Sequence, residues 1–310
     1  MMKKNDNVSD KMTDASPIDS IIFDCDGVLV DVSKSYDLAI IKTTKYVLEK
    51  FAGIVPIDVT PQMIDGLKST GGFNDEVDVT YALILAICAE NDSRSVFEMI
   101  KNADRSGIAS VEKYLGTNEN VIKMRKILNY PGPHATNPLY VMFDQIFYGP
   151  ELYQKIFGKK SEFSQKGLIE NDVVLLDDNL ILFLKKRFGK KMAIVTGRGL
   201  HSIRYSLGTK LDEFDVASSA FLEDEPRSMA KPNPESLVRT IENIGSRHCL
   251  YVGDSMEDLI MAKEATALGK KTTFCGIYGT GKDPQKKRAF FEQNGADMIL
   301  ESIGLLPKVL

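Results

Sequence analysis

A short apolar run, residues 21–23, stops abruptly at the acidic sequence Asp24-Cys25-Asp26-Gly27. Uninterrupted apolar runs of this length are typical of parallel strands that are buried on both faces. After about residue 171, similar runs alternate with helical patterns, which predicts a parallel sheet flanked by helices. The strands expected in this part of the chain are residues 192–195, 214–217, 250–252, 272–277 and 297–300.

The stretch between residues 33 and 166 has helical periodicity instead, interrupted at Gly71-Gly72 and at Pro131-Gly132-Pro133. One strand precedes this stretch and several follow it. We therefore expect a Rossmann-like, doubly wound α/β domain of residues 18–33 and 171–310, with a mainly helical domain of residues 34–170 inserted into it. Residues 1–17 are polar and are expected to form a flexible tail.

Composition excludes several classes of protein. The 310-residue chain has a formal net charge of -4 and no basic stripe interleaved with aromatics, so nucleic acid is not an expected partner. The longest apolar run, residues 81–89, is far shorter than the roughly 20 residues of a membrane span, and no secretory signal precedes it. The four cysteines lack zinc-site spacing and are expected to be buried thiols. These features favour a cytoplasmic protein without membrane contact, and they leave the oligomeric state open.

Four small polar clusters each follow an expected strand or open an expected helix. They are residues 24–27, 196–198, 231–234 and 253–258. Because the carboxyl ends of parallel strands lie at one edge of a sheet, these clusters are expected to converge there although they are far apart in the sequence.

The residue types in these clusters suit phosphoryl transfer, which needs an in-line nucleophile, positive charge and a proton donor. Asp24 can attack phosphorus, provided that a cation reduces the repulsion between two anions. Asp26 can protonate the leaving oxygen and then deprotonate water. Magnesium prefers oxygen ligands and would lie between Asp24 and Asp254.

The other clusters supply groups for the phosphoryl oxygens. Thr196 offers a hydroxyl beside the backbone N–H groups of a helix start, where Gly197 lies, and Lys231 offers a positive charge. Arg198 is either a substrate-binding residue or an exposed arginine at a helix end. Gly27 allows a sharp turn.

These residues resemble the four motifs of the haloacid dehalogenase-like hydrolase superfamily, and they occur in that family's order. The resemblance implies that Asp24 is the nucleophile, Asp26 the acid/base, Thr196 the second-motif residue and Lys231 the third-motif residue. The fourth motif, Gly-Asp-x-x-x-Asp, matches Gly253, Asp254 and Asp258. It further implies Mg²⁺, with Asp24, Asp26, Asp254 and Asp258 around the metal, where Asp258 either binds directly or orients the others.

An insertion directly after the first motif resembles the helical cap of some family members, which closes over the site and selects the substrate. This cap would be large, and residues 91–137 form an additional part without an assigned role. The segment Gly71-Gly72-Phe73-Asn74 resembles a feature of one branch that is named by association with histidine biosynthesis.

The expected activity is hydrolysis of a small phosphomonoester through an aspartyl-phosphate on Asp24. A sugar-phosphate phosphomutase remains an alternative. A metal-free dehalogenase is disfavoured because that branch lacks a residue like Asp26, and a non-catalytic binding module is disfavoured because every motif carboxylate is present. The sequence of residues 276–283 nearly matches the motif of a nucleotide-binding loop, but Asp283 replaces the hydroxyl residue that would bind magnesium. The acidic run 223–225 is expected to be a solvated loop, and no histidine cluster is expected to bind metal.

Overall fold

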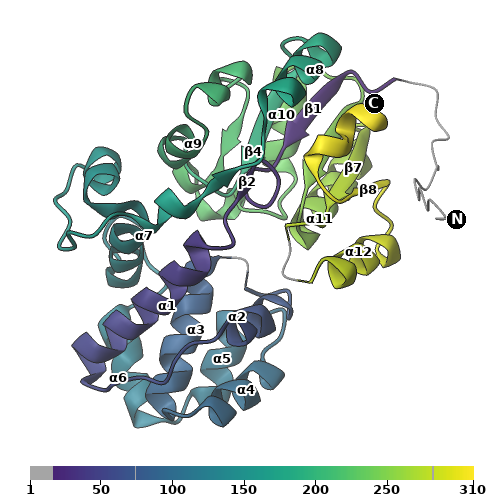
Figure 1. Cartoon of the computed structure of the whole chain (residues 1–310). Coiled ribbons are helices and arrows are strands. Elements are labelled where there is room, and N and C mark those ends of the chain that lie inside the picture. The colour runs from purple at the N-terminus through teal and green to yellow at the C-terminus, as the bar shows by residue number, and fades with distance from the viewer. Residues whose placement is uncertain (1–16, 74, 281–282) are drawn as a thin grey trace, which may run out of the picture. The chain divides into compact units, whose positions relative to one another are not determined.

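The computed structural model describes residues 17–73, 75–280 and 283–310, and the chain divides into two compact units (Figure 1). The α/β unit contains the described residues up to Ser33 together with Asp172–Leu310. The helical unit is Lys34–Asn171. All of the expected tail except Pro17 lies outside the described residues.

The α/β unit is built on a six-stranded sheet in the order β5-β4-β1-β6-β7-β8. Every neighbouring pair of these strands is parallel. The strands are β1 (Ser20–Phe23), β4 (Met192–Thr196), β5 (Ala220–Phe221), β6 (Cys249–Gly253), β7 (Thr272–Ile277) and β8 (Met298–Leu300). The predicted fold class, a Rossmann-like parallel sheet flanked by helices, is confirmed.

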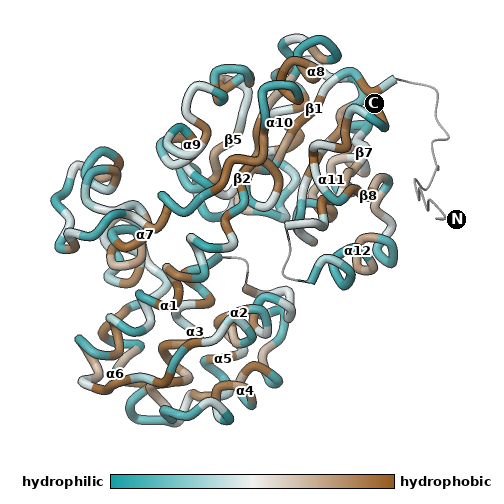
Figure 2. Tube along the Cα trace, viewed as in Figure 1, coloured by the Kyte–Doolittle hydropathy of each residue, from teal (hydrophilic) through white to brown (hydrophobic). Residues whose placement is uncertain are grey.

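Both faces of the sheet are buried, because successive side chains of a strand point to opposite sides. Ile21 and Phe23 of β1 pack into one apolar cluster, and Ile22 packs into the other. The first cluster includes residues of α8 (Asp178–Phe188) and α9 (Leu200–Leu207), and the second includes residues of α10 (Glu235–Asn243), α11 (Met256–Ala267) and α12 (Pro284–Gln293). Burial on both sides explains why the strands read as apolar runs. Figure 2 shows brown, hydrophobic segments in the sheet, for example at β1.

One expected strand, residues 214–217, is wrong. This segment forms a turn, and the strand that pairs with β4 is β5, a few residues later. Asp215 explains the difference, because its carboxylate accepts hydrogen bonds from both the backbone N–H and the hydroxyl of Ser218. Aspartate stabilises turns in this way in competition with a sheet ladder.

The α/β unit also has a two-stranded antiparallel ribbon formed by β2 (Val30–Asp31) and β3 (Val173–Val174). Val30 pairs with Val174, and Asp31 pairs with Val173. The chain leaves the α/β unit just after β2 and re-enters it just before β3. The two chain connections to the helical unit are therefore fixed side by side at their α/β ends.

The other helices of the helical unit pack around α3 (Glu76–Ala89), whose residues from Val79 to Ile87 are all buried. The proline-rich turn after α6 (Glu119–Leu128) and the glycine pair between α2 (Pro61–Lys68) and α3 interrupt the helices where the sequence predicted. The helices are α1 (Ser35–Val47), α2 (Pro61–Lys68), α3 (Glu76–Ala89), α4 (Ser93–Asn102), α5 (Ile108–Leu115), α6 (Glu119–Leu128) and α7 (Pro138–Phe157), the last broken at Gly149. The additional segment, residues 91–137, supplies α4, α5 and α6.

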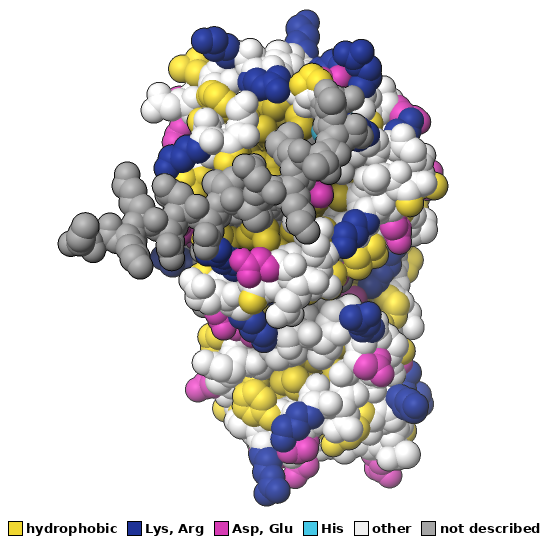
Figure 3. Space-filling model, turned by 90° about the vertical axis from the view of Figure 1, so that its right-hand side faces the viewer, with side chains coloured by type: hydrophobic (Ala, Val, Ile, Leu, Met, Phe, Trp, Pro, Cys, Tyr) yellow, Lys and Arg dark blue, Asp and Glu magenta, His cyan; other side chains and the backbone are white. Residues whose placement is uncertain are grey.

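Short irregular helices complete the two units. They are a π-helical turn, Leu48–Ala52, and 3₁₀ turns at Leu168–Asn171, Gly208–Glu213, Leu222–Asp224, Arg227–Met229 and Ile303–Lys308. Within the described part of the chain, no helix has the length and apolar character needed to cross a bilayer. On the face drawn in Figure 3, basic and acidic side chains are interspersed rather than gathered into one basic stripe.

Candidate active site

Asp24 is the first residue after β1 and lies at the carboxyl edge of the sheet, where its backbone N–H donates to Val252 O of β6. The following loop folds back tightly, because the N–H groups of residues 28 to 30 all donate to Cys25 O. Gly27 has a φ of 72°, and a Cβ there would lie 2.1 Å from Asp254 Oδ2. The first motif therefore requires glycine at this position both for its backbone conformation and for the space that the Asp254 carboxylate occupies.

Lys231 connects the first and fourth motifs. Its Nζ lies 2.8 Å from Asp24 Oδ1 and 2.7 Å from Asp258 Oδ1. The side chains of all three residues are nearly or fully buried. Three of the four clusters predicted to converge are thus joined by direct ion pairs. Asp24 follows β1, Asp258 lies in α11 after β6, and Lys231 lies in the loop before α10.

Asp258 accepts hydrogen bonds at both of its oxygens. In addition to Lys231, Oδ1 receives the Tyr251 hydroxyl at 2.7 Å, and Oδ2 receives the Ser255 hydroxyl at 2.7 Å and the N–H groups of Asp254 and Ser255 at 3.1 Å. Ser255 in turn accepts from Asp258 N, which completes a capping box at the start of α11. Asp258 therefore caps the helix and orients Lys231 and Asp254 at the same time.

Among the described residues, the carboxylates of Asp24, Asp254 and Asp258 form a group that could hold a metal ion, with one oxygen of each lying within 4.8 Å of the others. When all three carboxylates are ionised, their negative charge exceeds the positive charge of the two lysines that contact them, Lys231 and Lys287. Burial raises the pKa of Asp24 well above its usual range, Lys231 opposes that rise, and the neighbouring carboxylates add to it. A hard divalent cation fits this set of oxygen donors and would favour ionised Asp24.

The pKa of Asp258 moves in the opposite direction. Burial alone would raise it, but Lys231 and the hydrogen bonds from Ser255 and Tyr251 lower it below the usual value. Burial opposes the charge on Lys231, and Asp24 and Asp258 overcome that effect, so its pKa is raised. The buried pair of Lys231 and Asp258 is therefore held in its charged form.

Thr196 is the last residue of β4 and is fully buried, and its hydroxyl accepts from Arg198 N at 3.3 Å. Gly197 is exposed, with nothing within 4 Å of the position of a Cβ. The predicted helix start at this motif is α9. Its first N–H groups are already engaged, because Gly199 N donates to Glu223 and Leu200 N donates to Asp224, each at 2.8 Å. The acidic run is thus a partner of this helix start rather than only a solvated loop.

Arg198 does not lie at an exposed helix end. Its side chain is 1% exposed, its Nε lies 2.7 Å from Asp26 Oδ1, and its Nη1 lies 2.8 Å from Asp172 Oδ2. Asp26 is outside the group of carboxylates that could hold metal. The buried position of Arg198 between two carboxylates favours an internal role over the predicted substrate contact.

Lys287 and Thr280 complete the edge of the site and were not predicted from the sequence. Lys287 Nζ of α12 lies 2.5 Å from Asp254 Oδ2, and the Thr280 hydroxyl donates to Gly27 O at 2.7 Å. Thr280 belongs to the loop whose sequence nearly matches a nucleotide-binding motif. Gly281 and Lys282 of this loop lie outside the described residues. Nothing in the sequence distinguished Lys287 from the adjacent Lys286, although only Lys287 contacts Asp254.

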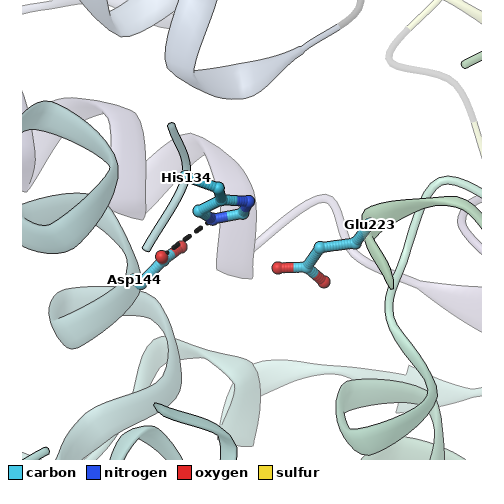
Figure 4. Close-up of side chains that lie close together, drawn as sticks. All are labelled: His134, Asp144 and Glu223. Atoms are coloured by element: carbon cyan, nitrogen blue, oxygen red, sulfur yellow. Dashed lines mark hydrogen bonds and ion pairs between the residues drawn. The ribbon is translucent and has the colours of Figure 1, made fainter. Parts of the chain in front are cut away.

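The helical unit contains a partly buried histidine–aspartate contact. His134 Nε2 lies 2.9 Å from Asp144 Oδ2 (Figure 4), and the His134 ring packs on Tyr140 with centroids 4.3 Å apart. Glu223, drawn in the same figure, belongs to the α/β unit, where it accepts a hydrogen bond from Gly199 N. Within the described residues, all four cysteines are buried and free, as predicted.

The sequence model of the family described as "haloacid dehalogenase-like hydrolase" matches residues 166–266. That segment contains Thr196, Lys231, Asp254 and Asp258, and β1, which leads into Asp24, pairs with two strands inside it. Over this segment the chain is similar to the haloacid dehalogenase-like hydrolases.

Solved structures and a curated protein are similar to this chain at low sequence identity. Among solved structures, this chain is similar to "Phosphatase Tt82 from Thermococcus thioreducens", at a TM-score of 0.61 and 22% identity, over 85% of this chain and 94% of that one. It is also similar to a "predicted phosphoglycolate phosphatase" from Haemophilus somnus, at a TM-score of 0.52 and 15% identity, over 96% and 99% of the two chains. These likenesses concern the fold.

A curated protein named "Imidazoleglycerol-phosphate dehydratase" from Phytophthora nicotianae is 24% identical over 305 residues, which are 95% of this chain and 54% of that protein. The chain thus spans about half the length of the curated relative that it matches. The segment Gly71-Gly72-Phe73, which resembles a branch named for histidine biosynthesis, lies between α2 and α3, and Asn74 lies outside the described residues.

Proposed function

We propose that this protein is a Mg²⁺-dependent phosphatase that acts on a small phosphomonoester through an aspartyl-phosphate on Asp24. The observation that carries the proposal is the position of Lys231 Nζ, which lies within 2.8 Å of both Asp24 and Asp258. A lysine between a nucleophilic carboxylate and an acidic metal-binding group is suited to binding a phosphoryl group at the point of attack.

In the first step an Asp24 carboxylate oxygen attacks phosphorus, and the bond from phosphorus to the ester oxygen breaks. Asp26 donates its proton to the departing alkoxide, which leaves as an alcohol. In the second step ionised Asp26 takes a proton from water, and the water oxygen attacks the phosphorus of the aspartyl-phosphate. Breakage of the phosphorus–Asp24 bond then gives inorganic phosphate and restores both carboxyl groups.

Asp24 and Asp254 would hold Mg²⁺, with Asp258 positioning Asp254 and Lys231 through its hydrogen bonds. When bound, the ion supplies positive charge to the phosphoryl oxygens and reduces their repulsion with the attacking carboxylate. Lys231 adds a second positive charge, and the Thr196 hydroxyl with the Gly197 N–H would bind the remaining phosphoryl oxygens.

The helical unit would act as the cap, excluding water from the aspartyl-phosphate and selecting the alcohol part of the substrate. This assignment rests on the place of the insertion, directly after the first motif, and on the β2–β3 ribbon at its two connections. The substrate class would be small phosphorylated metabolites, because a cap leaves little room for a macromolecule beside the site.

The Asp24→Asn variant tests the nucleophile. Release of phosphate should fall more than about a thousandfold, because the amide cannot attack phosphorus, while the fold is kept because little volume changes. The measurement is phosphate release from sugar phosphates, nucleotides, histidinol phosphate and an activated aryl phosphate, with and without a chelator. Asp212→Asn, at an exposed carboxylate, is the matched control and should leave the rate unchanged.

Activity of Asp24→Asn comparable to wild type would contradict the proposal, as would full activity after metal removal. Conversion of one sugar phosphate into its isomer without free phosphate would favour a phosphomutase that uses the same Asp24. Circular dichroism of each variant separates loss of chemistry from loss of fold.

A further inference from the structure

Arg198 forms a buried ionic bridge between two carboxylates that are far apart in the sequence. Its Nε contacts Asp26 Oδ1 at 2.7 Å, and its Nη1 contacts Asp172 Oδ2 at 2.8 Å. Ser206 of α9 closes the arrangement, because it accepts from Arg198 Nη1 and donates to Asp172 Oδ2, each at 2.9 Å. The Arg198 and Asp172 side chains are 1% and 3% exposed, whereas Asp26 is 28% exposed.

The two carboxylates lie on the two chain segments that connect the units. Asp26 precedes β2, and a β-bridge pairs it with Val30. Asp172 directly precedes β3, which pairs with β2. Arg198 therefore joins the outgoing loop to the returning strand at the place where the ribbon begins.

The shape of the side chain explains why an arginine is suited to this position. A guanidinium group presents N–H groups in a rigid planar fork and can contact two carboxylates at once, whereas a lysine ammonium is a single point charge. Without the guanidinium, the negative charges of Asp26 and Asp172 would repel each other in a partly buried environment. The bridge thus restricts the rotamer of Asp26, whose exposed fraction remains available to a substrate.

We propose that Arg198 is a positioning residue that holds the Asp26 carboxyl group where it can protonate the leaving oxygen, and that Asp172 and Ser206 hold Arg198 in turn. This inference rests on the proposed phosphatase function and goes further, because it assigns Arg198 to the acid/base rather than to the substrate. The 1% exposure of the arginine side chain supports this assignment over substrate contact.

The test compares two aryl esters of similar size that differ in their need for an acid. Phenyl phosphate releases a strongly basic phenolate and depends on proton donation, whereas 4-nitrophenyl phosphate releases a stable anion and depends on it much less. The measured quantity is kcat/KM for each ester, because this constant includes departure of the leaving group. The ratio of the two values is independent of the folded fraction of a preparation.

In Arg198→Lys, kcat/KM for phenyl phosphate should fall about tenfold more than that for 4-nitrophenyl phosphate, as part of the 10²- to 10⁴-fold that a positioned acid contributes. Asp172→Asn should change the ratio in the same direction by a smaller factor. In an Asp26→Asn background, Arg198→Lys should produce no further change in the ratio, because the acid through which it acts is absent. Arg204→Lys is the matched control, since Arg204 of α9 is exposed and pairs with the exposed Asp212, and it should leave both constants unchanged.

Equal losses for both esters in Arg198→Lys, or an undiminished effect in the Asp26→Asn background, would overturn the positioning role and leave the phosphatase proposal intact. Absence of phosphate release by the wild-type protein from both esters would overturn the proposed function and this inference with it.

Discussion

Lys287 forms an ion pair with one oxygen of the Asp254 carboxylate, which we propose as a metal ligand. Its Nζ lies 2.5 Å from Asp254 Oδ2, and the side chains of both residues are about one-fifth exposed. A bound cation and the lysine ammonium would compete for the same negative charge. A local amine therefore reduces metal affinity, and it also reduces carboxylate repulsion when no metal is bound.

The Lys287→Gln variant should bind Mg²⁺ about fivefold more tightly than wild type, a change of about 1 kcal/mol once solvent screening of a partly exposed pair is allowed for. Titration calorimetry of the protein with Mg²⁺ alone measures this, without reference to activity. Lys286→Gln removes the same charge from the adjacent, exposed residue and controls for long-range effects. The same affinity in both variants would show that the contact with Asp254 does not affect metal binding.

At the scale of secondary-structure elements, Asp19 ties the start of β1 to the turn before β6. Its Oδ1 accepts hydrogen bonds from the Ser246 hydroxyl at 2.9 Å and from the N–H groups of Arg247 and His248 at 3.2 Å. Burial alone would raise its pKa, but these hydrogen bonds, together with Lys191, lower it below the usual value. Asp19 thus helps to fix the register of β1 relative to β6. Only its ionised form makes all of these hydrogen bonds fully.

Because the pKa of Asp19 is lower in the folded protein than in the unfolded chain, its contribution to stability is present above the unfolded value. That contribution is lost as the pH falls through the folded value. The Asp19→Asn variant should therefore be less stable than wild type by about 1 to 2 kcal/mol at pH 7, with a smaller difference at about pH 3.

Urea unfolding followed by far-ultraviolet circular dichroism at the two pH values measures the effect of Asp19→Asn. Asp178→Asn is the control, because Asp178 is 88% exposed in its pair with Lys210 and should cost little at either pH. A destabilisation by Asp19→Asn that does not change with pH would contradict the assignment of the effect to its ionised form.

At the scale of the whole molecule, the two units have separate cores. The cluster of the helical unit draws its buried residues only from between Ala39 and Ile169, whereas the two clusters of the sheet contain none of that segment. The ribbon also fixes the exit and return of the chain next to each other. Each unit therefore has the buried core that independent folding requires.

Replacement of residues 34–171 by a short Gly-Ser linker should give an α/β unit that folds by itself, because helices of that unit cover both faces of the sheet. We expect cooperative thermal unfolding and Mg²⁺ affinity within about threefold of the full chain, since the carboxylates that we propose as metal ligands all belong to the retained part. Circular dichroism and calorimetry measure these two properties. A chain without a cooperative transition would show that the sheet depends on the helical unit.

The sequence alone was sufficient for the strands that are buried on both faces. Residues 21–23, 192–195, 250–252 and 272–277 were all predicted, because parallel strands covered by helices must be apolar throughout. The expected strand at 214–217 failed because apolar content alone does not reveal that the Asp215 side chain stabilises a turn. The motif residues were recognisable because their types suit phosphoryl transfer and because their order resembles that of a known family.

What only the tertiary structure decided is which charged groups are partners. The formal charges of Arg198, Lys287 and Asp258 are the same whether each side chain is exposed to water or paired with a residue of opposite charge. Their sequence neighbours do not show which of the two applies. Folding brings Arg198 to Asp26 and Asp172, Lys287 to Asp254, and Lys231 to Asp24 and Asp258. The sequence by itself determined the α/β fold and the chemical groups at the sheet edge, because apolar patterns and motifs are local features of the sequence. The pairing of those groups depends on distances across different strands, which exist only after the chain has folded.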